Sequence, residues 1–264
     1  MHMNSINNVL SRIEPYGLKD LKDANLMDRV DSKFIVPLSN LAGILDELQG
    51  SYRVLEINGN RVSNYTNQYY DTQPLKFYHD HHDGNLNRFK VRHRQYVDTK
   101  TSFLEIKHKD DEGRTNKTRI NITKEQLHNT EALDFVLDSV GIPMEDMNIS
   151  QYSGYQRIAL ANEATAERLT IDFNLWYALE TEEKIKLPNI CILELKQAKK
   201  STDSPFYSLK DSANILPLSF SKYCIGCALL YKDNLKSDRF TSTLNKLNDM
   251  LQQNNPLNAN LAIS

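Results

Sequence analysis

Residues 88–96 constrain the fold of this 264-residue chain more than any other segment, because basic side chains recur there at every second position. Side chains on a β-strand alternate between the two faces of the sheet, so Arg88, Lys90, Arg92 and Arg94 would project from one face. The side chains between them are mostly apolar and would project from the other face. A sheet that contains this strand would therefore present one strongly basic face.

The same alternation continues in other segments of the chain. Beyond those of 88–94, the basic side chains that we place on this face are Lys33, Lys107, Lys109, Lys117, Arg119, Arg157, Arg168, Lys196 and Lys222. The formal net charge is −2, so without these thirteen cations it would be −15. The small net charge therefore hides a strong segregation of charge.

Two interpretations of the basic face compete. A solvated outer face would explain one or two such strands, but like charges on adjacent strands repel one another. A bound polyanion would remove that repulsion, since Arg offers flat bidentate donors to phosphate oxygens and Lys offers mobile point charges. An acidic exterior would direct the ligand to the cavity rather than to the outer surface. We therefore predict a basic interior that holds a polyphosphate or a nucleoside triphosphate.

Period-two patterning predicts that most of the chain forms a sheet. The expected strands are 32–36, 62–71, 87–96, 102–109, 117–122, 155–161, 168–173, 190–196 and the segment near Lys222. Most connections are short, as at Asp111-Glu-Gly113, which favours an antiparallel sheet that closes on itself.

Three other segments have the spacing of amphipathic helices. They are 37–48 with Ser39 as N-cap, 123–140, and a third segment that begins at Leu235. The buried stripes expected on the second and third are Leu127, Leu133, Val136 and Leu137, and Phe240, Leu244, Leu247 and Leu251.

These elements predict an α+β fold, an antiparallel β tunnel with helices packed on its outside. We divide the chain into a partly helical N-terminal segment 1–27, a tunnel domain 28–232, and a C-terminal amphipathic helix and tail 233–264 that frays after Asn254.

Charge and hydropathy exclude several classes of protein. The net charge of −2 and the scarcity of aromatic side chains among the cations argue against a nucleic-acid partner. No segment approaches the roughly 18–20 apolar residues that span a bilayer, and the N-terminus lacks the apolar segment of a signal peptide. We therefore expect a cytoplasmic protein without a membrane segment.

The cysteines and a histidine cluster could indicate other chemistry. Cys224 and Cys227 lie in an apolar run, and with Cys191 they form an odd set without zinc-site spacing, so buried structural thiols are favoured over a redox pair. The sequence His-Asp-His-His-Asp over 79–83 precedes Gly84, which favours a solvent-exposed loop over a metal site.

Two carboxylates stand among the cations and could be ion-pair partners or metal ligands. Glu105 lies two residues before Lys107, which favours ion pairing, whereas Glu194 lies in an apolar run that favours a metal ligand. Oxygen ligands suit Mg²⁺ or Mn²⁺, which bind through one or two carboxylates together with phosphate oxygens.

The order of these motifs from 28 to 231 resembles the polyphosphate polymerase domain of the vacuolar transporter chaperone family, in the triphosphate tunnel metalloenzyme superfamily. The matching motifs are Lys33, Arg92-His-Arg94, Glu105-Ile-Lys107, Lys117-Thr-Arg119, Tyr155-Gln-Arg157, Arg168 to Asp172, Glu194 and Ser221-Lys222.

The resemblance implies a tunnel that holds ATP or polyphosphate with Mn²⁺ or Mg²⁺ at Glu194, and with Glu105 as a second candidate ligand. The implied catalytic side chains are Lys33, Arg92, Arg94, Lys107, Arg157 and Lys222. The implied phosphate-binding side chains are Arg88, Lys90, Lys109, Lys117, Arg119, Tyr155, Arg168, Lys196 and Ser221. The implied reaction is ATP-dependent polyphosphate synthesis, with a metal-dependent triphosphatase and a non-catalytic binding module as alternatives.

One departure from the superfamily bears on this choice. The triphosphatases carry Glu-x-Glu-x-Lys on the first strand, whereas this chain has Arg29-Val-Asp31-Ser-Lys33. Arg29 stands in place of the first metal-binding carboxylate, which disfavours simple hydrolysis and favours the polymerase-like branch.

Overall fold

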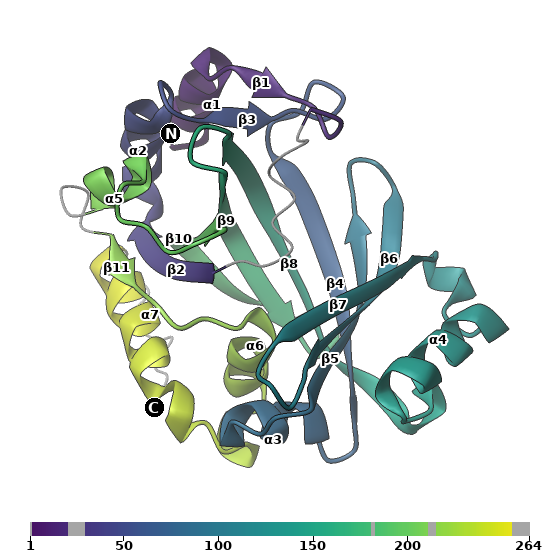
Figure 1. The fold of residues 1–264 in the computed structure, drawn as a ribbon. Helices are drawn as coiled ribbons and strands as arrows, with labels where there is room; N and C mark the ends of the chain where they lie inside the picture. The colour runs from purple at the N-terminus through teal and green to yellow at the C-terminus, as the bar shows by residue number, and fades with distance from the viewer. Residues whose placement is uncertain (1, 21–29, 181–182, 211–214, 255–264) are drawn as a thin grey trace.

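The computed structural model describes residues 2–20, 30–180, 183–210 and 215–254, and one large sheet dominates them (Figure 1). Eleven strands belong to it, in the order β11-β2-β10-β9-β8-β4-β5-β6-β7, with β3 beside β8 and β1 beside β3. Every pairing is antiparallel except that of β1 with β3. The strands are β1 Pro15–Tyr16, β2 Val30–Pro37, β3 Arg53–Leu55, β4 Ser63–Thr72, β5 Arg88–Tyr96, β6 Thr101–Lys109, β7 Thr115–Asn121, β8 Met147–Asn162, β9 Glu167–Ala178, β10 Ile185–Gln197 and β11 Leu216–Pro217.

Seven α-helices accompany the sheet in the described residues. They are α1 His2–Arg12, α2 Leu41–Leu48, α3 Lys76–Asp83, α4 Thr130–Val140, α5 Pro205–Lys210, α6 Lys222–Leu230 and α7 Thr241–Asn254. The predicted class, an antiparallel sheet with helices, is confirmed. None of the helices in the described ranges is long and apolar enough to cross a bilayer.

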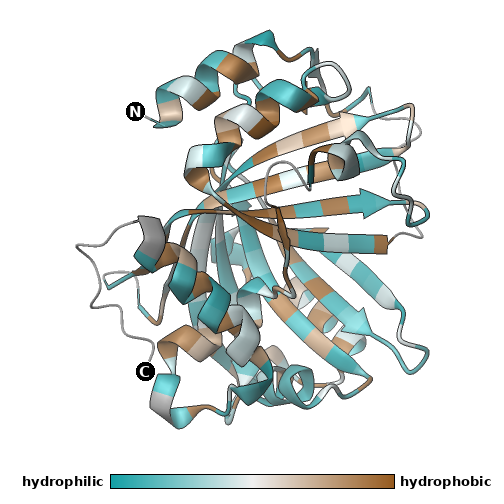
Figure 2. Cartoon of the chain, turned by 90° about the vertical axis from the view of Figure 1, so that its left-hand side faces the viewer, coloured by the Kyte–Doolittle hydropathy of each residue, from teal (hydrophilic) through white to brown (hydrophobic). Residues whose placement is uncertain are grey.

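The sheet is curved, and its outer face is covered at both ends. Apolar side chains of β2, β8, β9 and β10 pack against α1, α2 and α5, as Phe34 does against Phe206. At the other end, Val91 and Ile106 of β5 and β6 pack against Val136 of α4. Figure 2 shows the underlying pattern as alternating hydrophobic and hydrophilic bands along the strands.

The concave face is covered at one end by α6 and α7. Ile225 of α6 and Leu247 of α7 share an apolar cluster with Ile35 and Ile192, which alternate with the apolar outer-face residues of β2 and β10. The third predicted helix therefore packs inside the bend rather than outside it. The edge strands β7 and β11 do not pair with each other in the described part of the sheet.

The predicted strand near Lys222 is wrong. Residues 222–230 form α6, which is buried on nearly every side. A helix that is apolar on all sides has no amphipathic period. The sequence therefore contained no periodic pattern that would favour a helix over a strand at this position. Ser221 caps this helix, because its hydroxyl accepts a hydrogen bond from the backbone N–H of Cys224.

The helix predicted at 123–140 is interrupted. Thr123 and Gln126 form a capping box around a 3₁₀ turn, and α4 begins only at Thr130, where Asn129 accepts a hydrogen bond from the Ala132 N–H at 2.9 Å. Leu137 is 46% exposed, so its place in the predicted buried stripe is also wrong.

Two further local predictions need correction. Ser39 does not cap the first predicted helix, because its hydroxyl contacts the Asn40 side chain within a 3₁₀ turn that precedes α2. Residues 79–83 belong to α3, and Asp80 and His82 are buried instead of exposed in a loop. The helix ends at Gly84, whose φ of 81° suits glycine. All three cysteines are free and buried, as predicted, and the tail after Asn254 lies outside the described residues.

Candidate active site

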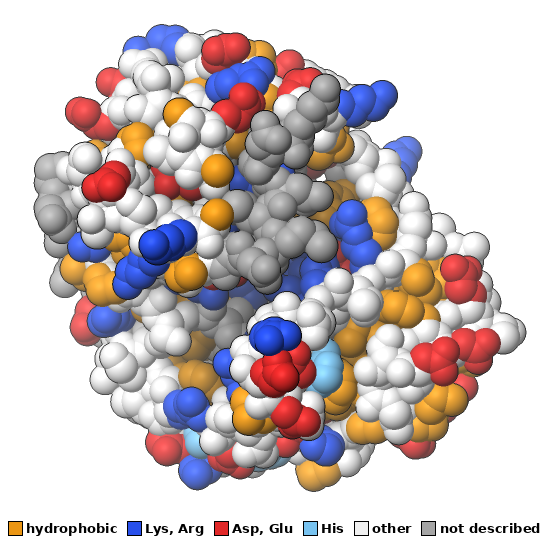
Figure 3. Space-filling model, viewed as in Figure 1, with side chains coloured by type: hydrophobic (Ala, Val, Ile, Leu, Met, Phe, Trp, Pro, Cys, Tyr) orange, Lys and Arg blue, Asp and Glu red, His pale blue; other side chains and the backbone are white. Residues whose placement is uncertain are grey.

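A cavity of about 1150 Å³ lies inside the bend of the sheet, and basic side chains from both halves of the sheet line it. Lys33 of β2 and Glu194 of β10 line it from one half, and Lys90 of β5 and Lys107 of β6 line it from the other. Figure 3 shows Lys and Arg side chains gathered in this hollow. Its other charged or titratable lining residues are Asp31, His81, Arg88, Lys109, Lys200, Tyr207, Lys210, Cys224, Arg239 and Lys246.

Strand register explains why the basic face is continuous. Arg88, Lys90 and Arg92 pair with Lys109, Lys107 and Glu105, so their side chains share one face. The intervening Val91 is fully buried under α4 on the opposite face. The alternation seen in the sequence is therefore present in the structure.

Glu105 is the centre of one ion-pair cluster. Its carboxylate accepts hydrogen bonds from Arg92 Nε at 2.8 Å and Nη2 at 2.5 Å, and from Lys117 Nζ at 2.5 Å. Arg94 Nη1 lies 3.9 Å away. Burial alone would raise the pKa of Glu105, but Arg92, Arg94 and Lys117 hold it well below its usual value. Glu105 is therefore ionised, and its oxygens are occupied by cations.

Asp172 organises a second cluster. It accepts two hydrogen bonds from Arg157, at 2.5 and 2.8 Å, and one from Lys222 at 2.5 Å. Burial would raise its pKa, but Arg157 and Lys222 lower it to about 2. This carboxylate ties β8 and β9 to the first residue of α6, and it places both cations at the concave face.

Glu194 belongs to a more open cluster. Its carboxylate lies 3.7 Å from Lys33 Nζ and 2.6 Å from Lys196 Nζ, and 20% of its side chain is exposed. Burial would raise its pKa, but Lys196 and Lys33 lower it well below the usual value. Glu194 faces the cavity, whereas the Glu105 side chain has no exposed surface.

The described residues contain no group of three or more His, Cys, Asp or Glu side chains placed to bind a metal ion. Mg²⁺ and Mn²⁺ nevertheless commonly bind through one or two protein carboxylates, with phosphate oxygens and water supplying the other ligands. The partly exposed Glu194 fits this arrangement, because it is a carboxylate that faces the cavity. Glu105 does not, because Arg92 and Lys117 already surround it.

Lys107 differs from these paired cations. Its strand neighbours on both sides are Lys90 and Lys117, and no described residue offers its ammonium group a hydrogen bond or an ion pair within 4 Å. Burial, Arg92 and Lys90 lower its pKa well below the usual value. Lys90 donates a hydrogen bond to Ser221 at 3.2 Å, which links β5 to the cap of α6.

Tyr155 forms an aromatic platform between the clusters. It stacks on Tyr65, its hydroxyl accepts a hydrogen bond from Arg94 at 2.8 Å, and Arg157 and Lys222 lie over its ring. Tyr155 therefore contacts three cations, through its ring as well as through its hydroxyl.

Five of the predicted phosphate-binding residues are not among those that line the cavity, namely Lys117, Arg119, Tyr155, Arg168 and Lys196. Arg119, on the edge strand β7, stacks on Phe103 with its guanidinium 4.4 Å from the ring centroid. Arg168 lies opposite Lys196 on β9, and its buried Nε has no hydrogen-bond partner among the described residues.

Sequence reasoning missed several residues of this region, including Tyr69. Arg92 donates a hydrogen bond to the Tyr69 hydroxyl at 3.2 Å, and the ring stacks on Tyr223. Burial would raise the pKa of Tyr69, but Arg92 and Arg94 lower it below its usual value. Its period-two spacing with Tyr65 and Asn67 was a usable signal, but those side chains carry no charge.

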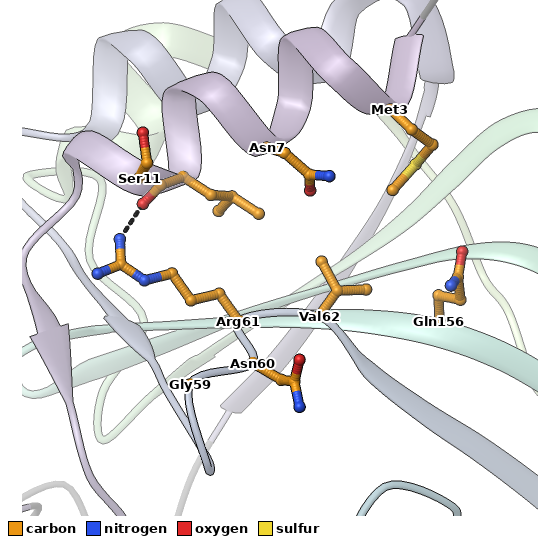
Figure 4. A pocket seen from close by; sticks show the side chains of 9 residues that line it. Met3, Asn7, Ser11, Gly59, Asn60, Arg61, Val62 and Gln156 are labelled. Atoms are coloured by element: carbon orange, nitrogen blue, oxygen red, sulfur yellow. Dashed lines mark hydrogen bonds between the residues drawn. The ribbon is translucent and has the colours of Figure 1, made fainter.

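A second pocket is separate from this region. It has a volume of about 490 Å³ and lies between α1 and residues 59–62, where Arg61 donates a hydrogen bond to the Leu10 carbonyl oxygen (Figure 4). None of the predicted site residues lines it, and its lining includes Met3, Asn7 and Gln156.

The sequence matches the family of VTC domains over residues 28–141 and 142–231. The chain therefore belongs to the VTC domain family, which confirms the resemblance found in its motifs. No curated protein matches the sequence.

Solved structures are similar to this one at low sequence identity. One is a proposed adenylyl cyclase from Hippeastrum, reported to have a dominant triphosphatase activity. It is 13% identical with a TM-score of 0.50, over 80% of this chain and 98% of that chain. Another is a proposed adenylate cyclase from Bacillus halodurans, 12% identical with a TM-score of 0.49, over 74% and 94%.

Proposed function

We propose that this protein transfers phosphoryl groups on a triphosphate or polyphosphate bound in the basic cavity, and that it lengthens polyphosphate at the expense of ATP. The observation that carries the proposal is the cavity itself, which Lys33, Lys90 and Lys107 line from opposite halves of one sheet together with the carboxylate of Glu194. Membership of the VTC domain family supports it.

The chain's own residues would act mainly by binding and by neutralising charge. Phosphoryl transfer passes through a loose transition state whose charge is spread over the oxygens of the transferred group. Lys107, which has no carboxylate partner among the described residues, would contact these oxygens directly. Arg92 and Arg157 would also face the phosphates, but each is held in place by a buried acid, Glu105 or Asp172. Such fixed donors need little reorganisation during the reaction.

No general base is required by this scheme, because the terminal phosphate of a chain is already an anionic nucleophile. Glu194 would hold Mn²⁺ or Mg²⁺, which would neutralise phosphate charge when bound. ADP would leave as the bond between the β- and γ-phosphates breaks and a new phosphoanhydride bond forms.

Hydrolysis by water is the second candidate reaction, and it differs only in the acceptor. Asp31 of β2 lines the cavity. In the sequence, Arg29, which lies outside the described residues, stands where the superfamily's triphosphatases carry their first acid. That substitution leaves fewer carboxylates for metal ions, so we favour transfer to a phosphate chain. A binding module without turnover is the third candidate.

The test is incubation of the purified protein with γ-labelled ATP and Mn²⁺, followed by separation of orthophosphate from long-chain polyphosphate on a gel. We expect labelled long chains, and we expect Lys107→Met to abolish them. Release of orthophosphate alone would establish the triphosphatase instead. Binding of ATP without either product would leave a binding module and overturn the catalytic proposal.

A further inference from the structure

Three basic side chains meet at the end of α3. The reaction proposed above assigns no specific role to them. They are His81 on α3, Arg88 on β5 and Arg239 in the 3₁₀ turn Asp238–Phe240, and all three line the cavity. Arg239 Nη1 donates a hydrogen bond to the His82 carbonyl oxygen at 2.8 Å, and Arg88 Nη1 donates one to the Asn85 carbonyl oxygen at 2.5 Å. The C-terminal end of a helix carries partial negative charge, so it can hold two guanidinium groups close together.

Gly84 makes room for Arg239. A Cβ atom at this position would lie 2.4 Å from Arg239 Nη1, which is closer than real contacts allow, and 3.0 Å from Nη2. The backbone there also has a φ of 81°, which disfavours other residues. The guanidinium of Arg239 is therefore seated on the helix end, although it is far away in the sequence.

This basic group has no anionic partner in the described part of the chain. Neither Arg88 nor Arg239 forms an ion pair there, and the buried Nε of Arg88 has no hydrogen-bond partner. The nearby Asp80 is engaged by Lys76 at 2.6 Å and by the Asn85 amide at 3.0 Å. Burial and like charges explain why Arg88 itself has a lowered pKa, since Arg239 repels it.

His81 lies within the same group. No hydrogen bond to its ring is formed by the described residues. Burial, followed by the charges of Lys90, Arg88, Lys109 and Arg239, lowers its pKa to about 2. The imidazole is therefore neutral in the empty protein and faces a cavity surrounded by cations.

We propose that His81, Arg88 and Arg239 form a phosphate-binding subsite in the part of the cavity next to α3, and that it holds a phosphate group of a chain longer than a triphosphate. The ligand class rests on the proposed function. The cavity of about 1150 Å³ exceeds the roughly 300–1,000 Å³ of ordinary small-molecule sites, so it has room beyond the phosphates at Lys33 and Lys107. Arg239 lies after the segment that matches the family, residues 28–231.

Binding at this subsite has a consequence for protons. A bound phosphate places negative charge beside His81, so the pKa of His81 rises from its lowered value, and the imidazole takes up a proton at pH values below that raised pKa. The charged groups that act on it are Arg88 and Lys90 from β5, Lys109 from β6 and Arg239 from the 3₁₀ turn. Because the bound state holds more protons, long chains should bind more tightly as pH falls.

The experiment compares inorganic tripolyphosphate with a long polyphosphate of tens of phosphates, by calorimetry in two buffers of different ionisation enthalpy. The variants are His81→Asn and Arg239→Gln, with Arg239→Lys as a charge-retaining version. His79→Asn on the same helix and Arg114→Gln on the exposed turn after β6 are matched controls, because neither residue lines the cavity. Melting temperatures without ligand show whether each variant folds.

We expect His81→Asn and Arg239→Gln to weaken long-chain binding by about tenfold each, which corresponds to 1.4 kcal/mol, and to leave tripolyphosphate binding unchanged. His81→Asn should also remove proton uptake, and Arg239→Lys should recover part of the affinity. Unchanged long-chain binding in His81→Asn would overturn the subsite, as would an equal loss for both probes. If the parent protein bound neither probe, the proposed function itself would be refuted. That outcome differs from those that refute the subsite alone, in which the parent protein still binds both probes.

Discussion

Replacement of Glu105 by Gln tests whether the centre of the basic face is structural. Glutamine keeps the size of the side chain and removes its charge. Arg92 and Lys117 would lose their partner, and Arg94, at 3.9 Å, would lose its nearest carboxylate. The substitution therefore leaves several cations close together with no acid among them.

The magnitude follows from the burial of the pair. The Arg92 side chain is 12% exposed and that of Glu105 is 0% exposed, whereas Lys117 is 34% exposed and is partly screened by solvent. Breaking a buried pair costs roughly 3–5 kcal/mol because it leaves an uncompensated charge. For a chain of this size each kcal/mol lowers the melting temperature by about 2–4 °C, so we expect a fall of roughly 6–20 °C.

The assay is thermal unfolding at pH 7, with and without tripolyphosphate. Glu112→Gln is the matched control, because Glu112 pairs with Arg114 at 2.8 Å but both side chains are more than half exposed. Such pairs contribute about 0–1 kcal/mol. Tripolyphosphate should restore more stability to Glu105→Gln than to the parent, since it supplies the missing negative charge. Equal melting temperatures for Glu105→Gln and Glu112→Gln would refute the structural role.

Two further substitutions test the other acids. Glu194→Gln should abolish metal-dependent turnover, measured with labelled ATP, and leave triphosphate affinity largely intact, measured by calorimetry. Loss of both affinity and stability would instead show that Glu194 serves as an ion-pair partner of Lys33 and Lys196. Asp172→Asn should cost roughly 3 kcal/mol at pH 7. Because the pKa of Asp172 is lowered to about 2, the parent's advantage should persist above about pH 4 and disappear as pH falls towards 2; a difference independent of pH would contradict this.

The strand patterning could be predicted because it depends on local alternation. Residues 87–96 and 102–109 were expected as strands, and β5 and β6 span Arg88–Tyr96 and Thr101–Lys109. The basic face followed from the same alternation. Glu105 was expected to form ion pairs because it lies two residues before Lys107, but its partners are Arg92 and Lys117 on the two adjacent strands.

The features that the sequence did not predict have a common physical cause, which is that they depend on tertiary packing. α6 is buried on nearly every side, so its apolar run carried no helical period. Arg119 projects from the expected face but lies on an edge strand, and no local pattern distinguishes an edge from a centre. The contact of Arg239 with His82 joins residues far apart in the chain, and only the fold brings them together.

The last prediction concerns the stability of the empty cavity, and Lys107→Met tests it better than changes at Arg92 or Arg94. Those arginines have partners in Glu105, Asn67 and Tyr155, so their removal also breaks favourable contacts. Lys107 has cationic neighbours on both adjacent strands. Methionine keeps the length of the aliphatic chain and removes the charge.

We expect Lys107→Met to raise the melting temperature of the empty protein at pH 7. The pKa of Lys107 is lower in the folded protein than in the unfolded chain, so its protonated form opposes folding. The stability of the parent should therefore rise with pH between the lowered pKa and the ordinary value near about 10.4, and the advantage of Lys107→Met should shrink over that window. Lys186→Met, at an exposed position on β10, is the control.

Ligand binding should reverse this order. A ligand that binds only the folded protein contributes roughly 2.7 kcal/mol at 100 times its dissociation constant. At one fixed concentration of tripolyphosphate, the parent should gain more stability than Lys107→Met, because the variant lacks a cation that would contact the phosphates. A variant that melts lower than the parent when empty, and that responds equally to tripolyphosphate, would show that Lys107 faces solvent. The charge repulsion that we assign to the empty cavity would then be absent, and with it the main evidence that the cavity binds an anion.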